Sequence, residues 1–393
     1  MTHISRQQAR RFLLLKHGLI DPHRFAGSQG VLDFMDQAGC IQFDPIDVCG
    51  KNAELVLQSR VKGFRKTDLY DLLYTERSLL DYFDKNLSII RTADWPYFQP
   101  IRNAYRDRSR SQQQVENVSE AIKAIIRQQG PVSSADLDYD HKVDWYWSHT
   151  RLARAALELM YFWGDLVVHH KQGTTKYYDL AGNCLDQTVL DQSDPFSDEF
   201  SHLMWRVRRR IGAVGLLWNR GSDAWLNIQG LKAPVRSEIF RQLLDDGLIL
   251  EVKVDTMKEP LYLQADDWHL LEQACSDQKL NARCELIAPL DNLLWDRRLI
   301  GELFGFDYKW EIYTPVDQRK YGYYVLPLLY GEQFVARIEA VCDRRQGILI
   351  VKNIWYEDGV RQTKRMQQAI DRCLKRFAGF NDCLQISRQE QPI

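Results

Sequence analysis

The chain has 393 residues, of which 45% are hydrophobic and 27% charged, and its 52 basic and 53 acidic side chains nearly cancel. This length suggests about two to four domains, and the charge balance excludes a histone-like protein, although a basic groove needs only a local excess of charge. No run approaches the roughly 18 apolar residues of a membrane-spanning helix, and the N-terminal stretch lacks the apolar core of a secretory signal.

A pattern of helices followed by a short hairpin recurs three times along the chain. The predicted helices cover 6–17, 30–38 and 66–82 in the first copy, 115–129 and 150–163 in the second, and 208–218 and 234–244 in the third. Predicted hairpins cover 165–180 and 248–263. Helix, turn, helix and a two-stranded wing is the winged-helix pattern, which commonly docks on duplex DNA. The alternative for any one copy is that it only packs against another copy.

The sequence pattern becomes β-rich after about residue 275. Predicted strands cover 308–313, 321–329, 334–341 and 347–355, and a last helix covers 362–377. We therefore expect an α+β fold with three tandem winged-helix domains, followed by a C-terminal antiparallel β-sheet region with a final helix. The predicted boundaries are 1–110, 111–190, 191–272 and 273–393.

Basic residues gather in several places. The predicted DNA contacts are Arg60, Arg206, Arg208, Arg209, Arg210, Arg297, Arg298, Arg319 and Lys320. Alone, such charges are typical of solvated faces that acidic residues balance. Beside tandem winged helices they predict a surface that contacts phosphates, which positions a protein on DNA without reading its sequence.

One short segment of the first domain carries candidate chemistry: Cys40-Ile41-Gln42-Phe43-Asp44-Pro45-Ile46. In an extended chain, Gln42 and Asp44 project to the same side. A carboxylate can polarise a water molecule, and a neighbouring amide can donate and accept hydrogen bonds and so orient that water. The pair suffices for hydrolysis when the leaving group is already activated. The structural alternative is that Asp44 caps a helix that has Pro45 at its first position.

The longest distinctive runs lie in the C-terminal region, at 288–298, 303–308, 311–313 and 320–327. Together with 57–60, 72–83 and 145–168, they resemble the YcaQ-like winged-helix DNA glycosylases, the AlkX and AlkZ relatives. The resemblance covers most of the chain. Gln42-Phe43-Asp44 looks like the Gln-apolar-Asp catalytic motif of the AlkX branch, whereas the AlkZ branch has Gln-apolar-Gln.

The resemblance implies excision of N7-alkylated guanines, including interstrand crosslinks and bulky nitrogen-mustard adducts. Alkylation at N7 makes the base cationic, so it leaves without a general acid. Asp44 would stabilise the oxocarbenium-like sugar and activate water, and Gln42 would orient that water. The motif contains no lysine that could form a Schiff base, so we expect a monofunctional hydrolase. A crosslinked base cannot swing freely into a closed pocket, so an open groove formed by several winged helices would suit it.

The chain departs from the family pattern in one place. Many relatives carry a Trp-x-His-Glu-like stretch where this chain reads Tyr82-Phe83-Asp84-Lys85-Asn86-Leu87. If the absent histidine contacts the lesion or the DNA backbone, the substrate range or the rate differs here. In that case we expect Asp84 to substitute in part.

The expected partner is double-stranded DNA with alkylation damage, bound by a monomer that does not associate with membranes. We expect no metal and no nucleotide cofactor. The eight cysteines contain no CxxC pair, which favours reduced thiols in a cytoplasmic protein. The rival hypothesis is a non-catalytic winged-helix regulator, which would bind a specific DNA sequence and release no base. The chain has no evident dimerisation helix, which favours the enzyme.

Overall fold

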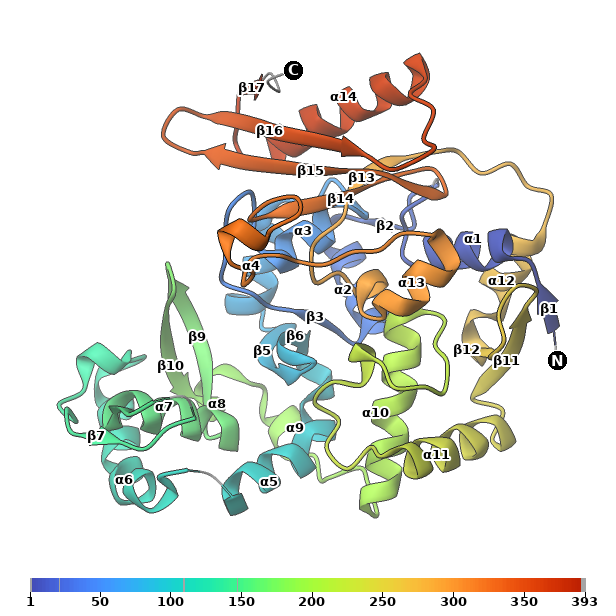
Figure 1. Ribbon diagram of the computed structural model, residues 1–393. Helices are drawn as coiled ribbons and strands as arrows, with labels where there is room; N and C mark the ends of the chain where they lie inside the picture. The colour runs from blue at the N-terminus through green and yellow to red at the C-terminus, as the bar shows by residue number, and fades with distance from the viewer. Residues whose placement is uncertain (1, 21, 109, 147, 390–393) are drawn as a thin grey trace. The chain divides into compact units, whose positions relative to one another are not determined.

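The computed structural model describes residues 2–20, 22–108, 110–146 and 148–389 (Figure 1). The chain forms two compact units. Unit 1 comprises Met1–Leu69, Phe83–Ile89 and Leu203–Ile393, and unit 2 comprises Tyr70–Tyr82 and Ile90–His202. Both units mix helices and strands, which confirms the α+β class. The division into four domains stays a prediction.

The N-terminal segment of unit 1 begins as the sequence predicts. Helix α1 (Arg6–Lys16) starts at Ser5, whose hydroxyl accepts a hydrogen bond from the Gln8 backbone N–H, while the Gln8 side chain accepts from the Ser5 N–H. This capping box satisfies two donors that a helix start leaves unpaired. Strand β1 (Thr2–Ile4) pairs in parallel with β11 (Ile249–Val254). The N-terminus therefore extends the hairpin that the sequence predicts in the third copy.

The other elements of unit 1 before the C-terminal sheet are short. They are β2 (Phe25–Ala26), α2 (Gly27–Ala38), β3 (Cys40–Gln42), α3 (Asn52–Gln58), β4 (Val61–Lys62), α11 (Ala233–Asp245), β12 (Leu261–Gln264), α12 (Trp268–Cys275) and α13 (Arg297–Phe304). Helix α10 (Glu199–Val214) begins at the end of unit 2 and continues into unit 1. Strands β11 and β12 form the predicted antiparallel hairpin.

The predicted helix over 66–82 is wrong in its second half. Helix α4 (Lys66–Tyr74) ends early, and β5 (Leu79–Asp84) and β6 (Asn86–Arg91) follow it. Arg77 adopts a φ of 56°, which interrupts a right-handed helix. Beyond that residue, five of the six positions of β5 are buried, so the segment forms a strand that is covered on both faces.

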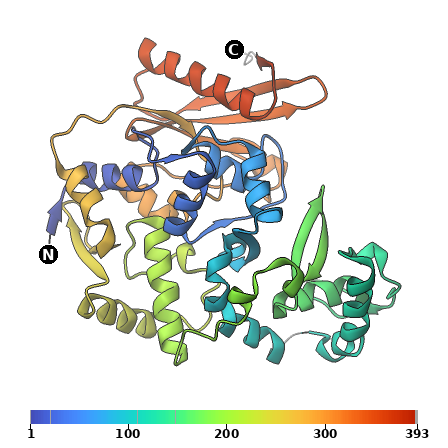
Figure 2. The same cartoon turned by 180° about the vertical axis from the view of Figure 1, so that it is seen from behind.

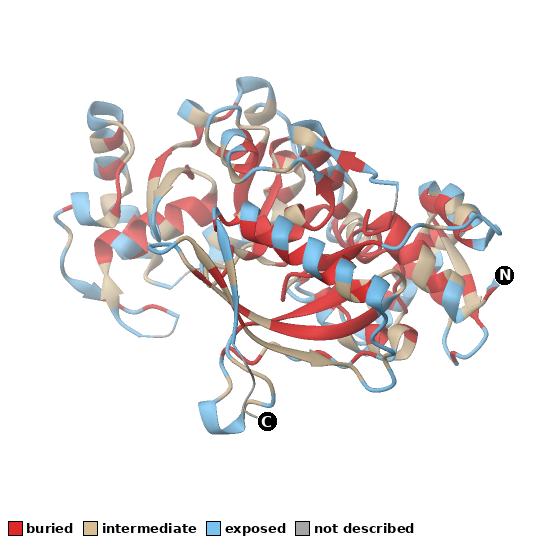
Figure 3. Cartoon of the chain, turned by 90° about the horizontal axis from the view of Figure 1, so that it is seen from above, coloured by how far each residue is buried: buried red, intermediate tan, exposed pale blue. Residues whose placement is uncertain are grey.

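A five-stranded sheet dominates the C-terminal region of unit 1. Its order is β13 (Cys284–Leu286), β14 (Val325–Tyr330), β15 (Gln333–Asp343), β16 (Ile348–Tyr356) and β17 (Gln385–Arg388). The first four strands are antiparallel, as predicted, and β17 pairs in parallel with β16. Helix α14 (Lys364–Phe380) covers one face (Figure 2). Buried residues line the strands beneath it (Figure 3).

Two sequence predictions for this region are wrong. The run 308–313 forms a loop instead of a strand, because the Glu311 carboxylate accepts backbone hydrogen bonds from Lys320, Tyr321 and Gly322 and folds two segments together. The last helix is also not the final element, because β17 follows it.

Unit 2 contains the second predicted copy. Its elements are α5 (Gln99–Arg108), α6 (Gln112–Gln129), β7 (Lys142–Val143), β8 (Thr150–Arg151), α7 (Leu152–Trp163), β9 (Leu166–Gln172), β10 (Thr175–Leu180), α8 (Ala181–Cys184) and α9 (Gln187–Leu190). Strands β9 and β10 form the predicted hairpin. Across both units, no helix among the described residues is long and apolar enough to cross a bilayer.

Candidate functional site

The Gln42-Phe43-Asp44 segment leaves the end of β3 as a loop. Helix α3 begins only at Asn52, so the alternative in which Asp44 caps a helix starting at Pro45 is wrong. Asp44 Oδ1 instead accepts a hydrogen bond from the Ile46 N–H at 2.9 Å, which fixes a local turn. This bond uses one of the several acceptor positions of a carboxylate and leaves the others for a ligand or water.

Asp44 lies in a partly desolvated place. The carboxylate is half-buried, and burial raises its pKa, although the hydrogen bond from Ile46 opposes that shift. Tyr324, the residue before β14, is buried. Burial is the main cause that raises its pKa, and Cys49, Tyr308 and Asp44 raise it further, in that order. A carboxylate with a raised pKa is a stronger base toward water than a solvated aspartate, which is a common property of catalytic groups.

Two asparagines hold β3 against the C-terminal region. Asn52 donates from Nδ2 to the Gln42 carbonyl at 2.7 Å and accepts at Oδ1 from the Leu290 N–H at 3.0 Å. Asn292 donates from Nδ2 to the Cys40 carbonyl at 2.9 Å. The distinctive run 288–298 therefore positions the Gln-x-Asp segment, a role that the sequence analysis did not assign to it.

Lys85 is a neighbour of Gln42 that the sequence analysis missed. It joins β5 to β6, and Asn86 adopts a φ of 59° that closes this tight turn. Strand β6 lies beside β3, and the Phe43 N–H donates to the Leu87 carbonyl at 2.8 Å. This pairing brings the Lys85 ammonium to 3.3 Å from Gln42 Oε1, to which it donates.

The surroundings of Lys85 are unusual for a charged group. The residue is only 5% exposed, and its ammonium lies 5.2 Å from the centre of the Trp295 ring. Burial is the main cause that lowers its pKa to about 8, and the charge of Arg210 is the second cause. Among the described residues, no carboxylate forms an ion pair with Lys85. Burying an ammonium without a carboxylate partner costs stability.

Replacing Lys85 by Met is expected to raise the free energy of unfolding near pH 7 by about 1–2 kcal/mol. The pKa falls from 10.5 to about 8. That shift corresponds to a cost of about 3 kcal/mol, and the lost hydrogen bond to Gln42 offsets about 1 kcal/mol or more. The cost is complete below pH 8 and disappears above pH 10.5. Denaturant unfolding at pH 7 and at pH 10 should therefore show a gain that shrinks as the pH rises; a destabilised variant at pH 7 would contradict it.

Asp84 forms ion pairs with three arginines of α10. Its carboxylate is 1% exposed and pairs with Arg206 at 3.0 Å, Arg209 at 2.9 Å and Arg210 at 2.7 Å. Burial alone would raise the pKa of Asp84, but the three guanidiniums, Arg210 foremost, lower it overall. Because the side chains of Arg206 and Arg210 are 3% and 0% exposed, the prediction that they contact DNA is wrong. Asp84 is also engaged, so it does not replace the absent histidine.

Arg60 likewise belongs to the core of unit 1. Its guanidinium pairs with Asp291 at 2.9 Å, and both side chains are fully buried. It also donates to the His17 carbonyl at 3.0 Å and lies over the Phe34 ring. The prediction that Arg60 contacts DNA is therefore wrong, because a phosphate cannot reach this guanidinium.

The remaining predicted DNA contacts are accessible to different degrees. Arg298 and Lys320 are exposed, and Arg208, Arg297 and Arg319 are partly exposed. The side chain of Arg209, by contrast, is only 9% exposed. Arg208 pairs with the exposed Asp266 at 3.1 Å. A cavity of about 180 Å³ opens next to the start of β3, and its lining residues are Asp36, Gln37, Gly39, Trp205, Arg208, Arg209 and Gln264.

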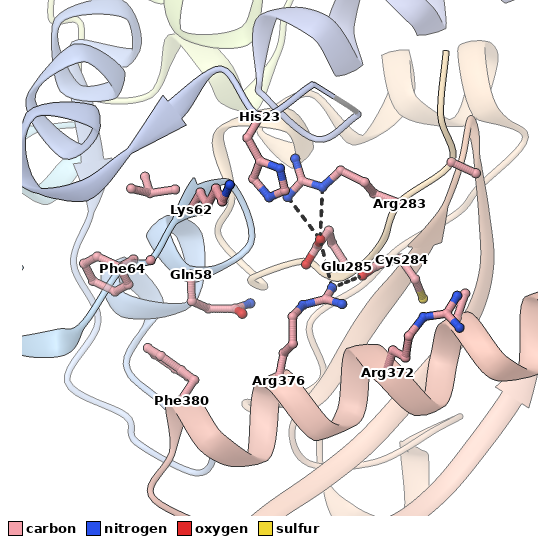
Figure 4. A pocket seen from close by; sticks show the side chains of 14 residues that line it. His23, Gln58, Lys62, Phe64, Arg283, Cys284, Glu285, Arg372, Arg376 and Phe380 are labelled. Atoms are coloured by element: carbon pink, nitrogen blue, oxygen red, sulfur yellow. Dashed lines mark hydrogen bonds and ion pairs between the residues drawn. The ribbon is translucent and has the colours of Figure 1, made fainter. Parts of the chain in front are cut away.

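A larger cavity, of about 470 Å³, lies between α14, β4 and β13 (Figure 4). In it, Glu285 pairs with Arg283 and Arg376, each at 3.0 Å. Its lining residues include neither Gln42 nor Asp44. The cavity therefore does not belong to the candidate site.

Comparisons with known proteins point to one family. A model of the family described as DNA glycosylase AlkZ-like matches residues 35–380. Among solved structures, the chain is similar to the Streptomyces sahachiroi DNA glycosylase AlkZ, with a TM-score of 0.64 and 14% identity. The similarity covers 99% of this chain and 100% of that chain. At this identity the structural match shows the fold alone, and the family model carries the functional inference.

Proposed function

Because the chain belongs to the AlkZ-like family of DNA glycosylases, we propose that it hydrolyses the N-glycosidic bond of N7-alkylated guanine in double-stranded DNA. The proposed substrates include interstrand crosslinks and bulky mustard adducts. The observation that supports this chemistry best is the half-buried Asp44, with its raised pKa, two residues from Gln42. The sequence also keeps the Gln-apolar-Asp pattern over these positions.

The proposed reaction divides the work between the two residues. The cationic base leaves without a general acid, and the Asp44 carboxylate stabilises the positive charge that develops on the sugar. Asp44 then accepts a proton from the attacking water. Since Lys85 donates to Gln42 Oε1, the Nε2 group of Gln42 is left to donate to that water. In this proposal, water is thus the nucleophile that hydrolyses the glycosidic bond.

We further propose that the three helix-hairpin copies are winged helices that hold the DNA as a monomer. The accessible basic residues Arg208, Arg297, Arg298, Arg319 and Lys320 would neutralise phosphates. Arg208 lines the small cavity that also includes Gly39, the residue before β3, and this cavity is one candidate position for a phosphate. An open groove formed by several winged helices would admit a crosslinked base, which cannot rotate freely into a closed pocket.

The test is base release from duplexes that carry an N7-alkylguanine mustard monoadduct or crosslink, with an unmodified duplex as control. Wild type should leave abasic sites only in the damaged duplexes. Replacing Gln42 by Ala should lower the single-turnover rate by about 10- to 100-fold, because the water loses one of its two orienting partners. Absence of base release from both lesions, together with sequence-specific binding, would instead favour the regulator.

A further inference from the structure

We propose that Lys85 is an amine nucleophile that attacks the abasic product, which gives this protein a DNA strand-cleaving lyase activity in addition to base excision. The inference rests on the proposed function in one respect: the sugar must occupy the space beside Gln42 and Asp44. It extends that function to the step after excision, for which the sequence motif offered no nucleophile.

The Lys85 amine lies next to Gln42, where the abasic sugar would form. The Lys85 ammonium donates to Gln42 Oε1 at 3.3 Å, so the amine lies within one side chain of the water that Gln42 would orient. That water attacks C1′ of the sugar, and C1′ becomes the aldehyde carbon of the abasic product. The side chain extends from the turn between β5 and β6, and its ammonium lies 5.2 Å from the centre of the Trp295 ring.

The burial of Lys85 also favours its role as a nucleophile. A buried ammonium without a carboxylate partner is expensive, and such groups are concentrated at functional sites. Burial lowers the pKa of Lys85 to about 8. At neutral pH, about a tenth of the lysine is therefore the free amine, whereas a solvated lysine has less than about a thousandth in that form. Amines desolvated in this way are the usual lysine nucleophiles toward carbonyl groups.

The proposed reaction needs only the ring-opened abasic sugar and water. The free amine attacks the C1′ aldehyde, protons move from nitrogen to oxygen, and water leaves as the C=N bond forms. The imine acidifies the C2′ proton, which water accepts. The electrons of that C–H bond form the C2′=C3′ double bond, and the C3′–O bond breaks as its electron pair departs with the phosphate. Hydrolysis of the imine then restores Lys85 and releases an unsaturated aldehyde.

The test uses the full chain and a duplex with a preformed abasic site, obtained by removing uracil with a separate enzyme. Sodium borohydride should reduce the imine and link protein to DNA, and peptide mapping of the wild-type adduct by mass spectrometry should place the link on Lys85. Replacing Lys85 by Arg keeps the charge and the hydrogen-bond donor but cannot form the imine, so trapping should fall at least about tenfold. Replacing the exposed Lys279 by Arg is the matched control and should leave trapping unchanged.

The outcomes separate this inference from the proposed function, because the abasic site is supplied in advance. No adduct, an adduct that Lys85→Arg retains, or a link mapped to another amine would overturn the lyase inference and leave base release untouched. Conversely, if the protein is linked to DNA through Lys85 but releases no alkylguanine, the lyase inference is supported and the glycosylase proposal is contradicted. Peptide mapping uses the wild type alone, so the test remains decisive if Lys85→Arg folds poorly.

Discussion

Replacing Asp44 by Asn is expected to lower the single-turnover rate of base release by about 100- to 10,000-fold. The amide cannot accept the proton of the attacking water, and it cannot offset the charge of the oxocarbenium-like sugar. Its oxygen can still accept the Ile46 N–H, so the local turn should persist. The rate would be measured on a duplex with an N7-alkylguanine lesion at saturating enzyme.

Asp47 provides a matched control in the same loop. Its carboxylate accepts the Gly50 N–H at 3.0 Å and pairs with Arg344 near the surface. A partly exposed ion pair near the surface contributes little, so Asp47→Asn should change the rate by less than about threefold. DNA affinity should be similar in both variants. Equal losses in the two variants would show that charge in this loop matters and that Asp44 has no specific role.

The candidate catalytic segment could be identified in the sequence because the pattern that defines it is local. An apolar stretch delivers Gln42 and Asp44 two residues apart, and no distant contact is needed to notice them. The alternative, in which Asp44 caps a helix, also rested on local sequence. Only the structure shows that no helix starts at Pro45. Lys85 is 43 residues from Gln42, and the pairing of β3 with β6 joins them. A strand pairing of that separation is not visible in one sequence.

For the arginines of α10, the local sequence suggested an exposed basic surface that the fold does not have. Arg209 and Arg210 are three and four residues from Arg206, so the three side chains lie on one side of the helix, and the local count of charges suggested a basic surface. The residue that neutralises them, Asp84, comes from a distant segment. Arg208 points elsewhere and stays accessible. Charge density along a chain therefore predicts an exposed basic face only when the opposing acidic residues are known.

Replacing Asp84 by Asn should destabilise the chain more than any other change of a single charge considered above. It would leave three guanidiniums close together without their carboxylate, and breaking a buried ion pair from one side costs about 3–5 kcal/mol. Asp84 is 1% exposed, so water cannot replace the lost partner. Denaturant unfolding would measure the loss, which should appear as a large fall in the midpoint or as failure to fold.

Asp266→Asn is the matched control, because that carboxylate pairs with Arg208 while its side chain is 79% exposed. It should cost less than about 1 kcal/mol. The pKa of Asp84 is lowered in the folded chain, so its stabilisation is present above the pKa of an unfolded aspartate and is lost as the pH falls toward the folded value. The gap between wild type and Asp84→Asn should therefore narrow in acid. If the two variants lose equal stability, the α10 arginines do not depend on Asp84, and their burial must be explained by packing.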